Sequence, residues 1–199
     1  MNDQDIIRFI KEECEKNNIT MVVDDAEFTY ADSIPCTGYF DHDQMKLAIA
    51  IKAPKAILIL IHEYCHMRQW IEQCDAWKEY EESDSGVIMD WWLARKIELT
   101  EEQQLKYFNI VAKLELDCEK RTVEFMKANG LESQVDVYIQ SANAYILSYQ
   151  FTRRLRSWNK PGQAPYNNPK VVEILPTTFV DVDFGCNSEV SLEILRSYV

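Results

Sequence analysis

The chain has 199 residues, enough for one domain with a sizeable core, and hydrophobic residues make up 47% of it, which excludes a disordered chain. Its 21 Lys and Arg residues stand against 33 Asp and Glu residues, so the formal net charge is −12. This balance argues against a partner that is a nucleic acid or an anionic membrane surface, because both require a basic face.

The amino-terminal part is expected to form a helix, a strand and a hairpin. Apolar residues at helical spacing predict a helix over 3–16, and the β-branched run 19–23 predicts a strand. Residues 34–51 form two extended stretches around a polar turn at 41–44, which is typical of a hairpin. We expect its second strand, 45–51, to be the exposed edge to which an extended peptide could add.

A buried helix is expected to follow the hairpin. Pro54 suits a first helical turn, and the next turns are apolar on all sides, which predicts a buried helix that ends near Trp77. A polar, acidic loop over 78–86 and a helix over 87–97 come next.

Two long helices and a tail are expected in the rest of the chain. Thr100 and Gln103 have the spacing of a capping box, which predicts the start of a helix. Asn129-Gly130 is a typical stop signal for this helix, and another helix is expected over 133–158. The remainder is rich in Pro and Asn and is expected to be extended chain over the surface.

These elements predict one α+β domain over 1–199, mostly helical with a small sheet, with its core over about 19–158 and a tail over about 159–199. The longest aliphatic run, Ala56–Ile61, is too short for a membrane span. The acidic amino terminus lacks the features of a secretory signal, and the six cysteines form no CxxC pair. We therefore expect a cytoplasmic protein with reduced thiols.

The segment His62-Glu63-Tyr64-Cys65-His66 is an HExxH motif inside the predicted buried helix. Residues four apart on a helix lie about 40° apart around its axis, so both imidazoles leave one face and can share a zinc ion. Glu63 lies beside them and can reach a water without binding the metal itself. The alternative is that ordinary hydrogen bonds satisfy both histidines. It is disfavoured because burying two histidines and a glutamate without a metal would leave unpaired polar groups, which costs free energy.

A catalytic zinc usually has three protein ligands. The remaining histidine, His42, is disfavoured because it lies in the polar hairpin turn. Glu115 and Glu119 share one face of the predicted long helix, and Glu115 is flanked by apolar residues, an unusual setting for a carboxylate without a cation. The alternative is that Glu115 pairs with Lys113 or Arg121 on a solvated face.

The HExxH motif followed on a later helix by Glu115-x-x-Cys118-Glu119 resembles the gluzincin zinc metallopeptidases. The hairpin GYFDHDQMKLAIA directly before the motif helix is similar to compact intracellular gluzincins of the ImmA/IrrE type and to small phage-encoded metallopeptidases. The motif-bearing match covers about 38–123.

This resemblance implies a zincin-like (minigluzincin) domain with a Zn²⁺ cofactor. His62, His66 and Glu115 would be the metal ligands, Glu63 the general base, and Glu119 would orient an imidazole through its second nitrogen. Gluzincins mostly have Asp or Asn where Glu119 stands, so whether Glu115 or Glu119 touches the metal stays open.

The implied activity is zinc-dependent hydrolysis of peptide bonds in a protein or peptide substrate, with a zinc-activated water and Glu63 as general base. The oxyanion requires a second donor, and Tyr145 is our choice among three tyrosines, 138, 145 and 149, that share one helix face. Plain core packing of these tyrosines is the alternative, and Arg153 or Arg154 could serve instead.

Two further readings of the same residues stay open. One is a catalytically silent, zinc-stabilised interaction module, which could include a closed site with Cys65 and Cys118, although both thiols also suit small apolar filling between helices. The other is a zinc hydrolase that acts on something other than a peptide. The presence of Glu63 favours an enzyme, because a binding module does not need it.

Overall fold

The structure is a computed structural model, and it describes residues 1–158 and 164–180. The described chain forms two compact units. The first unit comprises Met1–Cys74 and Glu124–Leu131, and the second comprises Asp75–Val123 and the described residues from Glu132 onward. The expected α+β class is confirmed, with mostly helical structure and two small sheets.

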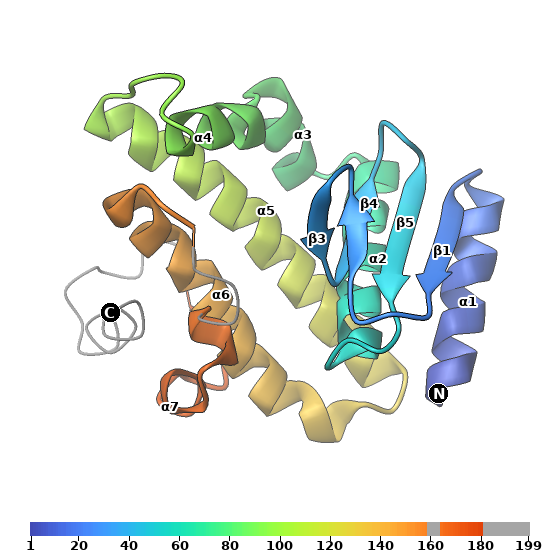
Figure 1. Cartoon of the computed structure of the whole chain (residues 1–199). Helices are drawn as coiled ribbons and strands as arrows, with labels where there is room; N and C mark the ends of the chain where they lie inside the picture. Colours follow the sequence, from blue (N-terminus) through green and yellow to red (C-terminus); the bar gives the residue numbers. More distant parts are fainter. Residues whose placement is uncertain (159–163, 181–199) are drawn as a thin grey trace. The chain divides into compact units, whose positions relative to one another are not determined.

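Within the described residues, the first unit contains α1, α2, the last turn of α5 and the strands (Figure 1). Its elements in chain order are α1 (Asp3–Lys16), β1 (Thr20–Asp24), β2 (Thr29–Ala31), β3 (Ile34–Cys36), β4 (Gly38–Asp41), β5 (Lys46–Ala50) and α2 (Ala56–Glu72). The predicted first helix, first strand and hairpin are confirmed, with β4 and β5 as the two antiparallel strands of the hairpin. The pair β2–β3 was not predicted.

Strand β5 lies in the centre of the three-stranded sheet, whose order is β1-β5-β4. The expectation that 45–51 forms the exposed edge is therefore wrong. Thr20 pairs with Lys46 and Asp24 with Ala50, so β1 adds to β5 in parallel and covers its second side. Residues 47–50 are fully buried, as is typical of a central strand with both faces covered.

Helix α2 lies against the sheet and against α1. It contacts β4 and β5, and α1 contacts both α2 and β1. The Sγ atom of Cys14 on α1 lies 3.6 Å from the Sδ atom of Met67 on α2. Gly38 lets β4 approach α2 closely, because a Cβ atom at this position would lie 2.9 Å from Cγ2 of Ile59. The buried side chains of α2 include Leu60, Ile61, Tyr64, Cys65 and Met67.

Helix α2 ends earlier than the sequence suggests. Its C-cap residue Gln73 adopts a left-handed conformation with φ 49°, and its backbone N–H bonds back to the carbonyls of Gln69 and Trp70. A new helix, α3 (Asp75–Glu82), begins two residues later and buries Trp77. The predicted single helix to Trp77 and the predicted loop over 78–86 are both wrong at this point.

The second unit contains the remaining helices. These are α3, α4 (Ser85–Leu93), α5 (Glu101–Ala128, whose last turn belongs to the first unit), α6 (Val135–Leu155) and α7 (Pro169–Val172), with short 3-10 turns at Glu132–Gln134 and Pro165–Asn167. The predicted capping box is confirmed, since Thr100 N–H donates to Oε1 of Gln103 at 2.9 Å and Gln103 N–H donates to Oγ1 of Thr100 at 3.2 Å. None of the helices in the two described ranges combines the length and the apolar character needed to cross a membrane.

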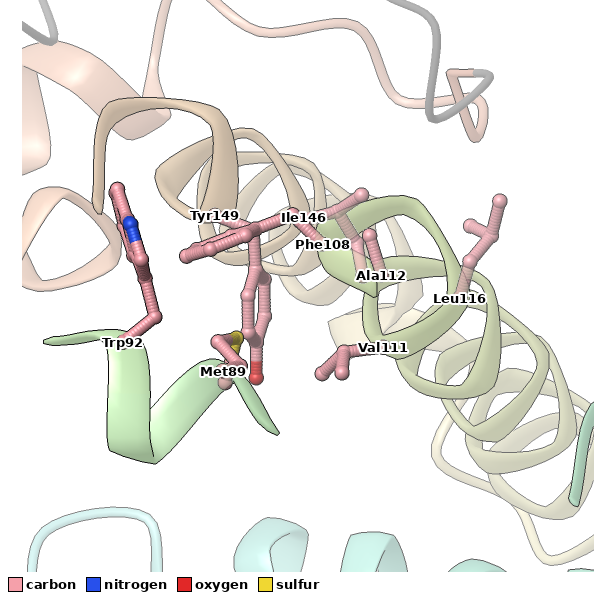
Figure 2. Packing of buried hydrophobic residues seen from close by; sticks show 8 residues of the cluster. All are labelled: Met89, Trp92, Phe108, Val111, Ala112, Leu116, Ile146 and Tyr149. Carbon is pink, nitrogen blue, oxygen red and sulfur yellow. The ribbon is translucent and has the colours of Figure 1, made fainter. Parts of the chain in front are cut away.

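The core of the second unit is built from α4, α5 and α6 (Figure 2). The rings of Trp92 and Phe108 meet edge to face with their centroids 5.7 Å apart. Burying this set of large side chains fixes the spacing of the three helices and so positions the polar residues that share α5 and α6. The cluster consists of Met89, Trp92, Phe108, Val111, Ala112, Leu116, Ile146 and Tyr149.

The described part of the tail is more regular than expected. Residues 164–180 include α7, which buries Val171 and Val172 against the α6 side chains Leu147 and Phe151. The amide of Asn143 donates to the carbonyls of Pro176 and Thr178. The expected extended chain is thus wrong for Pro165–Asn167 and Pro169–Val172, whereas 159–163 and 181–199 lie outside the described residues.

Candidate metal centre

The two motif histidines face each other on α2. The Nε2 atoms of His62 and His66 lie 3.1 Å apart, and their rings meet edge to face at 87° with centroids 4.7 Å apart. Both side chains and that of Glu63 are only half-buried, whereas Tyr64, Cys65 and Met67 between and beyond them are buried. The three polar residues of the motif are thus the partly exposed residues of this turn.

The distance between the two ring nitrogens fits a shared metal ion. Two nitrogens bound at about 2.1 Å to a tetrahedral zinc are about 3.4 Å apart. The observed 3.1 Å is close to this value, although without a metal the same contact is a hydrogen bond between the two rings, and both nitrogens are Nε2, which histidine commonly uses as a ligand. The residues present in the first unit thus fit a zinc ion held from one side by a single helix.

The other ring nitrogen of His66 contacts a buried amide. Nδ1 of His66 lies 2.8 Å from Oε1 of Gln69, one turn further along α2, and Gln69 is 0% exposed. Because an amide oxygen only accepts hydrogen bonds, this contact suits a His66 that carries its proton on Nδ1. In the neutral ring, Nε2 then keeps its lone pair and is the atom that can bind a metal.

The charge of Glu63 acts on a thiol of β3. Burial raises the pKa of the Cys36 thiol, and the charge of the Glu63 carboxylate contributes to the same shift. The next strand, β4, is the edge strand that contacts α2.

In the second unit, Glu115 and Glu119 each accept a hydrogen bond from a tyrosine of α6. The hydroxyl of Tyr138 donates to Oε2 of Glu119, which is buried. The hydroxyl of Tyr149 donates to Oε1 of Glu115 at 3.4 Å. The tyrosines predicted to share one face of this helix therefore donate hydrogen bonds to the two carboxylates, and Tyr149 also packs in the core.

Tyr145, our predicted oxyanion donor, bonds to a second tyrosine. Its hydroxyl and that of Tyr149 lie 2.9 Å apart, and the rings of Tyr145 and Tyr166 meet edge to face. Burial raises the pKa of Tyr145 and of Tyr149 well above 10, and the charge of Glu115 adds to both shifts. Both hydroxyls consequently keep their protons at neutral pH and remain hydrogen-bond donors.

The cations that the sequence offers as partners for Glu115 bind other acids. Nζ of Lys113 lies 3.9 Å from Oε2 of Glu79, and Nε of Arg121 donates to Oδ2 of Asp117 at 2.7 Å. Burial raises the pKa of Tyr80 on α3, and the charge of Glu115 contributes to this shift.

The other candidates from the sequence have these surroundings. His42 occupies the turn after β4, where its Nε2 lies 3.6 Å from Oδ1 of Asp43. Cys65 in the first unit and Cys118 in the second are both buried thiols. Arg153 donates from Nε to Oε1 of Gln150 at 3.4 Å, and Arg154 is exposed.

Comparison of this chain with known proteins finds no match. No family model, no curated protein and no solved structure matches this chain. The chemistry must therefore be inferred from the chain's own residues.

Sequence reasoning missed Gln69. Its only signal is its position three residues after His66, on the same side of a helix, in a segment where an apolar residue would be expected. Tyr149 was one of three equivalent candidates, and only the structure separates its contact with Glu115 from the contact of Tyr138 with Glu119.

Proposed function

We propose that this protein is a zinc-dependent peptidase. The observation that carries the proposal is the pair of Nε2 atoms of His62 and His66, 3.1 Å apart, on a helix turn that also carries the half-buried Glu63. Two nitrogen ligands one helical turn apart with an adjacent acid are the arrangement that metal-assisted hydrolysis requires. The resemblance of the motif and the later Glu115-x-x-Cys118-Glu119 segment to gluzincins points to the same chemistry.

We assign the third ligand to Glu115. The support for this assignment is the resemblance of Glu115-x-x-Cys118-Glu119 to gluzincins, and the hydroxyl of Tyr149, which donates to Oε1 of Glu115, holds that carboxylate in place. The thiol of Cys118 and the carboxylate of Glu119 are the competing donors on the same helix, and both are of types that bind zinc.

When bound, zinc supplies a Lewis acid that makes water nucleophilic near neutral pH and polarises a carbonyl group. Glu63 accepts the proton of the attacking water and returns it to the nitrogen of the leaving amine, which requires an ionised carboxylate that reaches solvent. Without substrate, the single hydroxyl proton of Tyr145 points to Tyr149, because Tyr149 uses its own proton for Glu115. During hydrolysis the hydroxyl of Tyr145 turns to donate to the developing oxyanion, and its raised pKa keeps the proton on Tyr145.

A peptide is the substrate class best supported by the first unit. Strand β4 is an edge strand, so one side of its backbone is available to pair with an extended chain. It contacts α2 on both sides of the motif, since Gly38 approaches Ile59 and the ring of Phe40 lies 5.9 Å from that of Trp70. A strand added to β4 would therefore run along the helix that carries Glu63.

Hydrolysis by the wild type and by Glu63→Gln tests the proposed function. Both proteins, loaded with zinc, are incubated with a peptide library whose products are identified by mass spectrometry. We expect both to bind about one zinc per chain and only the wild type to cleave. Bound zinc without any cleavage would replace the peptidase by a zinc-stabilised interaction module, and equal cleavage by Glu63→Gln would remove the role of Glu63.

The third ligand is tested by separate changes along one helix. Glu115→Gln is expected to lose zinc, and Asp117→Asn is the matched control because Asp117 pairs with Arg121 instead. Glu119→Gln and Cys118→Ser complete the series. Zinc retained by Glu115→Gln and lost by either of the other two would transfer the assignment to that residue.

A further inference from the structure

We propose that Gln69 is the positioning residue of this metal centre: its buried amide oxygen holds His66 in the tautomer that presents Nε2 to the metal. The proposal deepens the proposed function and rests on it for its consequence, which is metal affinity. Its structural part, the tautomer of His66, stands on the first unit alone.

The burial of Gln69 is unusual for its residue type. Glutamine is mostly exposed in proteins, yet Gln69 is 0% exposed on a helix whose other buried residues are mainly apolar. Burying an amide costs free energy unless it is hydrogen-bonded, so its contact with Nδ1 of His66 at 2.8 Å offsets part of that cost. A Leu or Met at this position would fill a similar volume without the cost of burying an amide.

The direction of the hydrogen bond decides what His66 can do. A neutral imidazole carries one proton, on Nδ1 or on Nε2, and only the nitrogen without the proton can bind a metal. Because Oε1 of Gln69 accepts, it stabilises the proton on Nδ1 and leaves the lone pair on Nε2, the atom 3.1 Å from Nε2 of His62. Partners of this kind also fix the ring orientation, and losing them typically costs about 10–100-fold in metal affinity.

The support of His66 comes from its own helix. His66 is oriented by a residue one turn away, and so its geometry is set within α2. We therefore expect His66 to keep its tautomer even before any metal binds.

Nitrogen chemical shifts measure the tautomer directly. The full chain is labelled with ¹⁵N at histidine, and spectra are recorded on the metal-free protein at a pH where the rings are neutral. We expect His66 to carry its proton on Nδ1 in the wild type and to become a mixture of both tautomers in Gln69→Leu. A wild-type His66 with its proton on Nε2 would overturn the proposal, whether or not zinc binds.

Zinc competition with a chelator measures the consequence. Gln69→Leu is expected to bind Zn²⁺ about 10–100-fold more weakly than the wild type. Gln69→Glu keeps an acceptor at the same place and is expected to bind within a few-fold of the wild type. The matched control is Gln150→Leu, which removes another buried glutamine, bonded to Asn109 at 3.0 Å, and is expected to leave zinc affinity unchanged.

The two possible failures are distinguishable. If the wild type binds zinc and Gln69→Leu binds it equally well, the positioning role is overturned while the proposed function stands. If the wild type binds no zinc, the proposed function fails, and the tautomer of wild-type His66 still decides the structural part. If Gln69→Leu does not fold, the nitrogen spectrum of the wild type still shows which tautomer His66 adopts and so tests the structural part of the proposal.

Discussion

Tyr149 donates a hydrogen bond to Oε1 of Glu115 at 3.4 Å, and its hydroxyl lies 2.9 Å from that of Tyr145. Two tyrosine hydroxyls thus form a chain that ends on the carboxylate we assign as the third ligand. Burial and the charge of Glu115 raise the pKa of both hydroxyls well above 10, so the chain keeps its protons at neutral pH. The two tyrosines are chemically alike but are expected to act on different steps.

Changing Tyr145→Phe and, separately, Tyr149→Phe separates these roles. Tyr145→Phe removes the proposed oxyanion donor and is expected to lower kcat about 100-fold at unchanged zinc affinity. Tyr149→Phe removes a support of Glu115 and is expected to weaken zinc binding instead. Steady-state kinetics on a cleaved peptide and chelator competition measure the two effects, and a Tyr145→Phe protein with wild-type kcat would exclude Tyr145 as the donor.

The thiol of Cys14 predicts a loss of stability at alkaline pH. Burial raises its pKa from 9.0 to about 11 in the folded protein, helped by Glu13 and Glu15. Between these values the unfolded thiol has lost its proton and the folded thiol has not, so the free energy of unfolding falls as the pH rises from about 9 to about 11.

Urea unfolding between pH 8 and 11 checks this prediction on the wild type and on Cys14→Ala. We expect the wild type to lose more stability over this range, by an additional amount on the order of 2 kcal/mol. Cys14→Ala is also expected to be less stable at every pH, because it leaves a small cavity beside Met67. Parallel curves for the two proteins would contradict the raised pKa.

Arg156 connects the end of α6 to the loop between α4 and α5. Its guanidinium donates to both carboxylate oxygens of Glu98 at 2.9 Å, to the carbonyls of Trp92 and Ile97, and stacks on the Trp92 ring at 4.7 Å. The ammonium group of a lysine cannot make all these hydrogen bonds at once. Arg156→Lys is therefore expected to lower the free energy of unfolding by about 1–3 kcal/mol. Exposed Arg154→Lys is the control, expected within about 0.5 kcal/mol of the wild type, and equal effects of both changes would contradict the assignment.

The capping box at the start of α5 offers a second stability test. Thr100→Ala removes the acceptor for the N–H of Gln103 and is expected to cost about 1 kcal/mol in urea unfolding. Lys120→Ala, at an exposed position further along the same helix, should change the stability by less than about 0.5 kcal/mol. If Thr100→Ala is as stable as Lys120→Ala, the cap contributes nothing measurable.

The sequence predicts the elements whose signals are local. The capping box at Thr100 and the apolar spacing in 3–16 are short-range patterns, and both elements form where expected. The break at Gln73 was missed because a non-glycine residue adopts the left-handed conformation there. The place of β5 depends on a parallel partner, β1, that is distant in sequence, although its apolar run over 47–50 already indicated burial on both faces.

Within the candidate site, the helical period alone predicts that His62 and His66 lie together, and this is confirmed by their 3.1 Å separation. The hydrogen-bond partner of His66 could not be predicted, because the amino-acid sequence around Gln69 does not show whether its side chain is buried or exposed to solvent. The roles of Glu63, Glu115 and Tyr145 depend on a metal and a substrate, so they stay predictions.

Zinc content per chain tests the central claim most directly. The full chain, refolded or purified with zinc present and then passed through a desalting column, is measured by atomic emission beside His62→Ala and His66→Ala. The account predicts about one zinc per wild-type chain and close to none in either variant. A wild-type chain without zinc, or variants that retain it fully, would contradict it.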